Sequence, residues 1–145
     1  MARVSTYLNF PRSTEAAFTF YKSVFGTEFS APMHRFSEVP PQPGFARMRE
    51  ADRNLVLHVE LPILGGHVLI GSDAPQSSGF PITRGNNVHI NLEPDTRTET
   101  ERLFKALADG GKVHMPLQET FWGGYSASVM DRFGVHWMLN CSVKP

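Results

Sequence analysis

The fold of this chain is decided by residues 4–26, which read VSTYLNFPRSTEAAFTFYKSVFG, and by a related stretch at residues 88–110, which reads VHINLEPDTRTETERLFKALADG. A shift of 84 residues aligns six identities: Val4 with Val88, Leu8 with Leu92, Thr14 with Thr98, Glu15 with Glu99, Phe20 with Phe104, and Gly26 with Gly110. Further along, a shift of 68 pairs Gly66 with Gly134. Such self-similarity is typical of a fold that contains two copies of one unit.

The change of shift from 84 to 68 predicts 16 additional residues in the first copy. The stretch 37–52 fits this insertion because it is rich in Pro and Gly and has no apolar periodicity. We therefore predict one domain over 1–145. It consists of a first repeat at 1–80, which contains the inserted loop 37–52, and a second repeat at 81–145.

Each copy has the pattern of a strand, a helix and three further strands. Apolar alternation predicts strands at 4–10 and 88–92. The first helix is expected to begin after Ser13 and end at Gly26, and the second to begin after Asp95 or Thr96 and end at Gly110. Six more strands are predicted at 27–36, 55–61, 67–72, 112–117, 124–130 and 135–142.

The resulting order is βαβββ, twice, which predicts an α+β fold. We expect the eight strands to form a curled, mixed sheet with a concave pocket. Concave surfaces where two modules meet are favoured sites for small molecules. The sequence therefore predicts a small-molecule ligand.

The charge balance and the cysteine content exclude other classes of protein. The chain has 14 Lys and Arg against 14 Asp and Glu, so it lacks the basic field that nucleic-acid binding needs. Polar residues and Pro62 interrupt its most apolar stretch, 55–71, so no membrane-spanning segment is expected. Cys141 is the single cysteine, which is typical of a reducing, cytoplasmic compartment. The apolar run before Cys141 favours a buried structural thiol over a nucleophile.

Six blocks of sequence carry a resemblance to a known family: Tyr7–Phe10, Ala16–Gly26, Gly71–Asp73, Gly85–Asn87, Gln118–Tyr125 and Asp131–Asn140. On these blocks the chain resembles the vicinal-oxygen-chelate superfamily of glyoxalases, dioxygenases and bleomycin-resistance proteins, in its PhnB-like branch. That branch is sometimes labelled 3-demethylubiquinone-9 3-methyltransferase-like. The sequence has no glycine-rich strand-to-helix turn that would cradle S-adenosylmethionine, so we discount the label. The resemblance also implies a homodimer.

The resemblance implies four positions for a metal site, one on each of four strands. They carry over to Ser5, Ile70, His89 and Met138, where the metal-dependent relatives hold His or Glu. Only His89 is a good ligand for a divalent ion, so we predict a degenerate metal site with no bound metal. The alternative is a shifted divalent-metal site in which His58 and Glu60, two residues apart on one strand, join His89.

Several other side chains are candidates for a ligand site. His89 and Asn91 share the polar face of a predicted strand, and Trp122 and Tyr125 flank two glycines in an aromatic segment. The predicted ligand-pocket residues are Ser5, His89, Asn91, Trp122, Tyr125 and Met138. The other interpretation of the aromatic segment is a hairpin that fills the core. Glu119 is the candidate catalytic base. We expect Trp137 in the core, and His34, His67, His114 and His136 in surface or structural roles.

The sequence is consistent with three functions. The first is a PhnB-like protein with a small-molecule pocket, a degenerate metal site and no assigned activity. The second is a metal-dependent enzyme of glyoxalase, lyase, isomerase or dioxygenase type. The third is a protein that sequesters an antibiotic or another aromatic ligand, as bleomycin-resistance proteins do. A fold alone does not choose among them.

Overall fold

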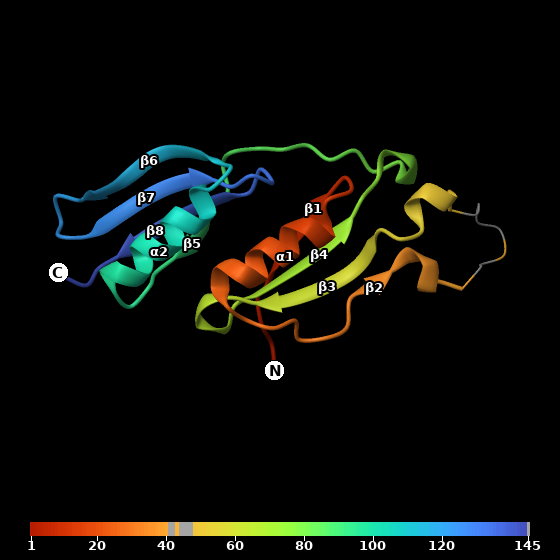
Figure 1. The fold of residues 1–145 in the computed structure, drawn as a ribbon, viewed down its shortest axis with the longest axis horizontal. Coiled ribbons are helices and arrows are strands. Elements are labelled where there is room, and N and C mark those ends of the chain that lie inside the picture. Colours follow the sequence, from red (N-terminus) through yellow and green to blue (C-terminus); the bar gives the residue numbers. More distant parts are fainter. Residues whose placement is uncertain (41–42, 44–47, 145) are drawn as a thin grey trace. The chain divides into compact units, whose positions relative to one another are not determined.

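The computed structural model describes residues 1–40, 43 and 48–144, and the chain divides into two compact units, Met1–Thr83 and Arg84–Pro145. We call these unit 1 and unit 2. In the described residues each unit carries one α-helix against one four-stranded sheet (Figure 1). The predicted loop 37–52 is described in part, and residues 41–42 and 44–47 of it lie outside the described residues.

Unit 1 has the strand order β1-β4-β3-β2. Strands β1 and β4 run parallel, and the other neighbours run antiparallel. Its elements are β1 (Thr6–Phe10), α1 (Thr14–Phe25), β2 (His34–Arg35), β3 (Val56–Pro62) and β4 (Val68–Asp73). The inserted loop follows β2.

Unit 2 repeats this topology in the order β5-β8-β7-β6, again with one parallel pair, β5 and β8. Its elements are β5 (Ile90–Leu92), α2 (Arg97–Ala108), β6 (Lys112–Glu119), β7 (Tyr125–Met130) and β8 (His136–Cys141). The predicted α+β fold with two βαβββ repeats is therefore confirmed, with the eight strands grouped as two mixed sheets.

The strand pairing confirms both sequence shifts. Tyr7 of β1 pairs with Ile70 of β4, and Asn91 of β5 pairs with Met138 of β8. The first members of these pairs lie 84 residues apart and the second members 68 apart. Two copies of one backbone arrangement therefore underlie the sequence repeat.

The helices do not follow the same shift. Thr14 is buried, whereas Thr98, its partner in the shift of 84, is exposed. The buried positions of α1, Thr14, Ala17 and Tyr21, align with Thr100, Leu103 and Leu107 of α2 at a shift of 86. Because two additional residues turn a helix by about 200°, a different stripe of the aligned α2 sequence faces its sheet.

The ends of the helices are fixed in different ways. Gly26 ends α1 as predicted, with φ 65° and its N–H donating to Lys22 O at 2.9 Å. Thr96 is the N-cap of α2, and its hydroxyl accepts from Glu99 N–H at 3.1 Å. Within the described part of the chain, Ser13 makes no side-chain capping bond. The Asp73 carboxylate of β4 accepts the Thr14 N–H instead, at 3.0 Å.

Strand β2 is much shorter than the predicted strand at 27–36, which was wrong over residues 27–33 and at residue 36. Pro32 lies in this stretch and has no N–H to donate to a neighbouring strand. Contacts before it hold the chain without a regular ladder: Thr27 Oγ1 donates to Pro62 O at 2.6 Å, and Ser30 N–H donates to Glu60 O at 3.2 Å.

Each core lies between a helix and one face of its sheet. In unit 1, Phe18 and Tyr21 of α1 are fully buried, and α1 packs on β3 and β4. In unit 2, α2 packs on β6, β7 and β8, and its Leu103 and Leu107 are fully buried. The predictions that Trp137 lies in the core and that Cys141 is a buried free thiol are confirmed. Among the described residues, no helix combines the length and the apolar character needed to cross a membrane.

Candidate functional site

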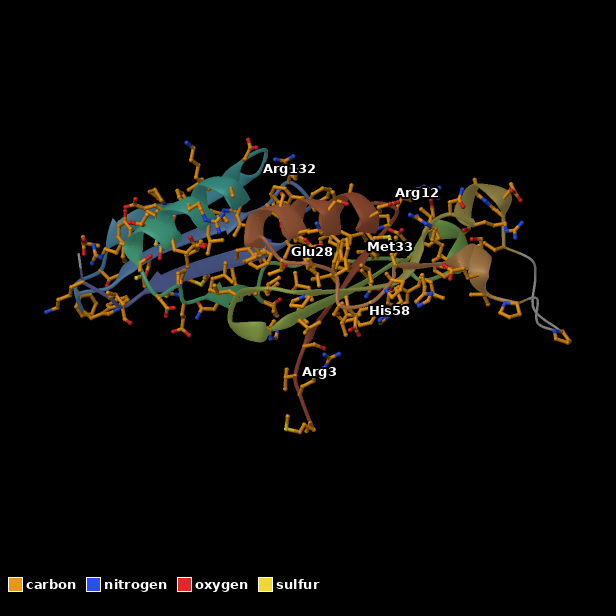
Figure 2. The ribbon with its side chains drawn as sticks, turned by 60° about the horizontal axis from the view of Figure 1, so that its bottom comes forward. Arg3, Arg12, Glu28, Met33, His58 and Arg132 are labelled. Carbon is orange, nitrogen blue, oxygen red and sulfur yellow. The ribbon has the colours of Figure 1, made fainter. Side chains whose placement is uncertain are left out.

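Several of the candidate site residues lie on the helix-free faces of the two sheets. In unit 1, Gly71 of β4 lies against α1, because a Cβ added there would be 2.4 Å from the Phe18 ring. Since neighbouring strand residues point to opposite sides, Ile70 and Ser72 face away from α1. Figure 2 shows His58 on this same side of the sheet.

A chain of hydrogen bonds crosses the helix-free face of unit 1. Tyr7 Oη donates to Ser72 Oγ at 3.2 Å, and Ser72 Oγ donates to Asn9 Oδ1 at 3.1 Å. Tyr7 and Asn9 are both exposed. This face of β1 and β4 therefore presents ordered polar groups to solvent.

Glu60 of β3 is surrounded by donors on the same face. Its carboxylate lies 3.3 Å from His58 Nε2, 3.4 Å from Arg3 Nη2 and 3.2 Å from Ser30 Oγ. The hydrogen bond with His58, that with Ser30 and the charge of Arg3 hold the pKa of Glu60 below its ordinary value. Glu60 is therefore an ionised carboxylate that already has partners.

The helix-free face of unit 2 carries a second chain of hydrogen bonds. Ser126 Oγ donates to Asn140 Oδ1 at 2.6 Å, and Asn140 Nδ2 donates to Asn91 Oδ1 at 2.6 Å. Met138 pairs with Asn91 across the parallel strands and is on this face. The structure thus brings together two predicted pocket residues, Asn91 and Met138. Sequence reasoning missed Asn140, although alternation along β8 places it on the same face as Met138.

Three histidines from separate segments of unit 2 lie together. The His136 ring centroid is 5.3 Å from that of His89 and 5.6 Å from that of His114. Burial is the main cause that lowers the pKa of His136, and the two neighbouring histidines lower it further. Asp131 and a backbone hydrogen bond with Gly85 act in the opposite direction. The predicted residue His89 therefore belongs to a cluster that the separate sequence positions did not indicate.

The four inherited metal positions do not fit a divalent ion. Ile70 has no donor atom, and its neighbours across the strands are Tyr7 and Glu60. Ser5 lies just before β1 and Met138 offers a soft thioether, so His89 is the one strong ligand of the four.

The alternative metal site of His58, Glu60 and His89 is not supported either. His58 and Arg3 both contact the same oxygen of Glu60, so a cation already lies beside that carboxylate. In the part of the chain that the structure describes, no group of three His, Cys, Asp or Glu side chains is arranged to hold a metal.

Trp122 lies in the turn between β6 and β7. Thr120 fixes this turn, because its hydroxyl accepts the Gly124 N–H at 2.8 Å. Trp122 is 68% exposed and meets the Phe121 ring edge-on at 4.9 Å. The interpretation in which this tryptophan fills the core is therefore wrong, and an exposed aromatic pair stands at the turn.

Tyr125 and Glu119 are separated from the Asn91 face. Tyr125 pairs with buried Cys141, which places it on the helix side, and its hydroxyl donates to Glu101 of α2 at 3.2 Å. Burial, followed by the Glu101 carboxylate, raises the pKa of Tyr125. Arg97 binds both carboxylate oxygens of Glu119 and lowers its pKa. These contacts favour a structural ion pair over a general base at Glu119.

Comparisons with known proteins give a consistent family. Residues 4–139 match the model of the Glyoxalase/Bleomycin resistance protein/Dioxygenase superfamily. The chain is 31% identical to Protein YjdN of Escherichia coli K12 over 94% of this chain and 93% of that protein. It is similar to the crystal structure of protein PA1353 from Pseudomonas aeruginosa, with 33% identity, a TM-score of 0.80, and coverage of 97% and 98% of the two chains. A putative 3-demethylubiquinone-9 3-methyltransferase, PhnB protein, from Bacillus cereus has the same fold, with 23% identity, a TM-score of 0.75, and coverage of 97% and 99%.

Proposed function

Because the chain belongs to the Glyoxalase/Bleomycin resistance protein/Dioxygenase superfamily, we propose that it is a PhnB-like member that binds a small polar molecule without the inherited metal centre. The observation that carries this proposal is the chain of hydrogen bonds from Ser126 through Asn140 to Asn91.

The direction of these bonds indicates what the ligand offers. Asn91 Oδ1 is used as an acceptor by Asn140, which orients the Asn91 amide and leaves its NH₂ group as the donor side. Asn91 is exposed, and the half-buried Met138 beside it supplies an apolar surface. A molecule with an oxygen acceptor next to an apolar group is complementary to this pair. His89, two residues before Asn91, is proposed to border this ligand, and Ser5 holds the equivalent position before Tyr7 in unit 1.

The test uses the side-chain amide resonances of ¹⁵N-labelled protein. A panel of small hydroxy acids, ketones and amides at millimolar concentration is expected to shift the side-chain signals of Asn91 and Asn140, and leave that of Asn54 unchanged. Asn91→Leu keeps the size of the side chain but removes the amide, so the shifts should disappear. Shifts that persist in Asn91→Leu, or a panel that moves neither signal, would contradict the proposal.

Metal analysis separates this proposal from the metal-dependent alternative. Protein purified without chelator is expected to contain far less than one metal ion per chain, and chelator should leave its melting temperature unchanged. Stoichiometric metal that is lost in His89→Ala would instead support an enzyme of glyoxalase, lyase, isomerase or dioxygenase type.

The exposed pair Phe121 and Trp122 favours a second candidate function, sequestration of a planar aromatic ligand as in bleomycin-resistance proteins. Planar aromatic probes such as acridine should then quench the fluorescence of Trp122 without being converted. Trp122→Phe leaves the buried Trp137 as the remaining tryptophan and should abolish this quenching. Equal quenching in the variant would reject the role of the aromatic pair.

We also propose a cytoplasmic homodimer. Exposed strand edges such as β6 allow pairing between copies, and a buried free thiol at Cys141 suits a reducing compartment. Light scattering coupled to size-exclusion chromatography measures the mass: about twice 16.2 kDa supports the dimer, and 16.2 kDa contradicts it.

A further inference from the structure

A pocket of about 420 Å³ lies in unit 1, away from the residues of the helix-free faces. Strands β1 and β4 run parallel and end together at the pair Phe10 and Asp73, and the segments that follow them form much of the pocket. Its lining residues are Pro11, Arg12, Arg49, Pro75, Gln76 and Ser77. This volume is in the range of sites that bind small molecules.

The fully buried carboxylate of Asp52 anchors the pocket. Arg12 Nη1 donates to it at 2.6 Å and Ser77 Oγ at 2.5 Å, and Arg49 Nε lies 3.5 Å away. The hydrogen bonds from Arg12 and Ser77 hold the pKa of Asp52 below its ordinary value. Asp52 is therefore ionised at neutral pH and orients the cations around it.

The pocket keeps an excess of one positive charge, since two arginines surround one carboxylate. Arg12 also donates to Ala51 O at 2.9 Å, so these two bonds account for two of its five N–H groups. Arg49 is 67% exposed at the pocket and Gln76 adds an amide. Because Arg12 is already held in place, an anion bound there would lose little free energy in ordering that side chain.

We propose that this pocket binds the phosphate group of a small organic phosphate. Arg12, Arg49 and Gln76 can donate from three separate residues, which suits a group with three terminal oxygens better than a planar carboxylate. The rings of Pro11 and Pro75 line the same pocket and offer apolar surface to the rest of the molecule. The site is independent of the ligand proposed for the Asn91 face.

The experiment titrates phenyl phosphate into ¹⁵N-labelled protein at low ionic strength and pH 7.5. The backbone signals of Gln76 and Ser77 should shift in a saturable way. Arg49→Gln should weaken binding roughly tenfold, since it removes a charge-assisted hydrogen bond. The matched control is Arg53→Gln, which removes a nearby arginine that pairs with Glu50 and does not line the pocket. That control should stay within about twofold of the original chain.

Two further measurements keep the proposal open to refutation. Benzoate replaces the phosphate by a carboxylate on the same ring, and it should bind more weakly than phenyl phosphate. Benzoate that binds as well or better would overturn the phosphate assignment. A titration without saturable shifts, or equal losses in Arg49→Gln and Arg53→Gln, would show only diffuse attraction and would also overturn it. Gln76→Leu leaves Asp52 and its partners intact, and it should also weaken the binding of phenyl phosphate. Unchanged binding in this variant would count against the site.

Discussion

The two units share strand pairing but distribute side-chain volume differently. Gly71 of β4 lies between Leu8 and Val59 on the neighbouring strands, and the Phe18 ring of α1 covers it. Leu139 holds the matching position in β8, between Leu92 and Ala127. In unit 1 a helix side chain, Phe18, fills the space at this position, and in unit 2 a sheet side chain, Leu139, fills it. A duplicated backbone can therefore keep its hydrogen bonds while its two cores are packed by different residues.

The units also differ in where they bury a carboxylate. Asp73 in unit 1 accepts from Thr14 N–H and from Val56 N–H at 2.8 Å, so it joins the starts of α1 and β3. Asp131 in unit 2 accepts from Phe133 N–H at 2.8 Å and Trp137 Nε1 at 2.8 Å. One buried aspartate joins a helix to a sheet, and the other ties a hairpin turn to a core aromatic residue.

The largest effect is expected from Asp131→Ala. It removes the partner of a fully buried indole N–H and of two backbone N–H groups, those of Phe133 and Val135. We expect a loss of about 3 kcal/mol in the free energy of unfolding, measured by urea denaturation with circular dichroism. In a Trp137→Phe background the same substitution should cost less, because the indole donor is gone. Equal costs in both backgrounds would refute the coupling between Asp131 and Trp137.

Gly71→Ala tests whether a side chain on β4 and the Phe18 ring of α1 compete for the same space. The added Cβ would lie 2.4 Å from the Phe18 ring, so the core of unit 1 is overpacked. We expect a loss of about 2 kcal/mol in the same urea experiment. Phe18→Leu makes room for the methyl group, so the double variant should be more stable than the sum of the single effects. Strict additivity would mean that the two positions do not compete for space.

The two helix starts offer a matched pair of substitutions. Thr96→Ala removes the bond to Glu99 N–H and should cost about 1 kcal/mol. Ser13→Ala should cost only a few tenths of that, because Asp73 satisfies the start of α1. Thermal melts of both variants check the difference. A larger loss at Ser13 would show that its hydroxyl does contribute to the cap.

The smallest expected effect is the contribution of His136 to the pH dependence of stability. Its pKa in the folded chain lies below the ordinary 6.5, so the unfolded state takes up the proton more readily. The stability that neutral His136 contributes is therefore present above about pH 6.5 and is lost as the pH falls below that value. Melting temperatures between pH 7.5 and 5.5 should fall less steeply for His136→Gln than for the original chain. An unchanged slope in His136→Gln would contradict this contribution.

Periodicity and shift predicted the parts of the fold that depend on local sequence. The shifts of 84 and 68 make the registers of the two parallel pairs equivalent, and Gly26 and Thr96 mark helix ends because they act on residues nearby. Alternation also placed Asn91 on a polar face, although it did not identify Asn140 as its partner.

The features that the sequence did not predict depend on contacts between segments that are distant in the chain. Arg12 and Asp52 lie 40 residues apart in the chain, and Asp73 caps a helix 59 residues before it. The three clustered histidines come from separate segments, and no spacing along the chain brings them together. Periodicity tells which side of a strand a residue takes, but it does not tell which distant residue it meets there.

The use of Asp73 as a helix cap also has a consequence for the order of folding. Thr96 and Glu99 are three residues apart, so α2 can satisfy its first turn as soon as those residues are synthesised. The first turn of α1 gains its buried acceptor only when β4 has paired with β1. We therefore expect the first turn of α2 to form from local contacts, whereas α1 becomes stable only together with its sheet.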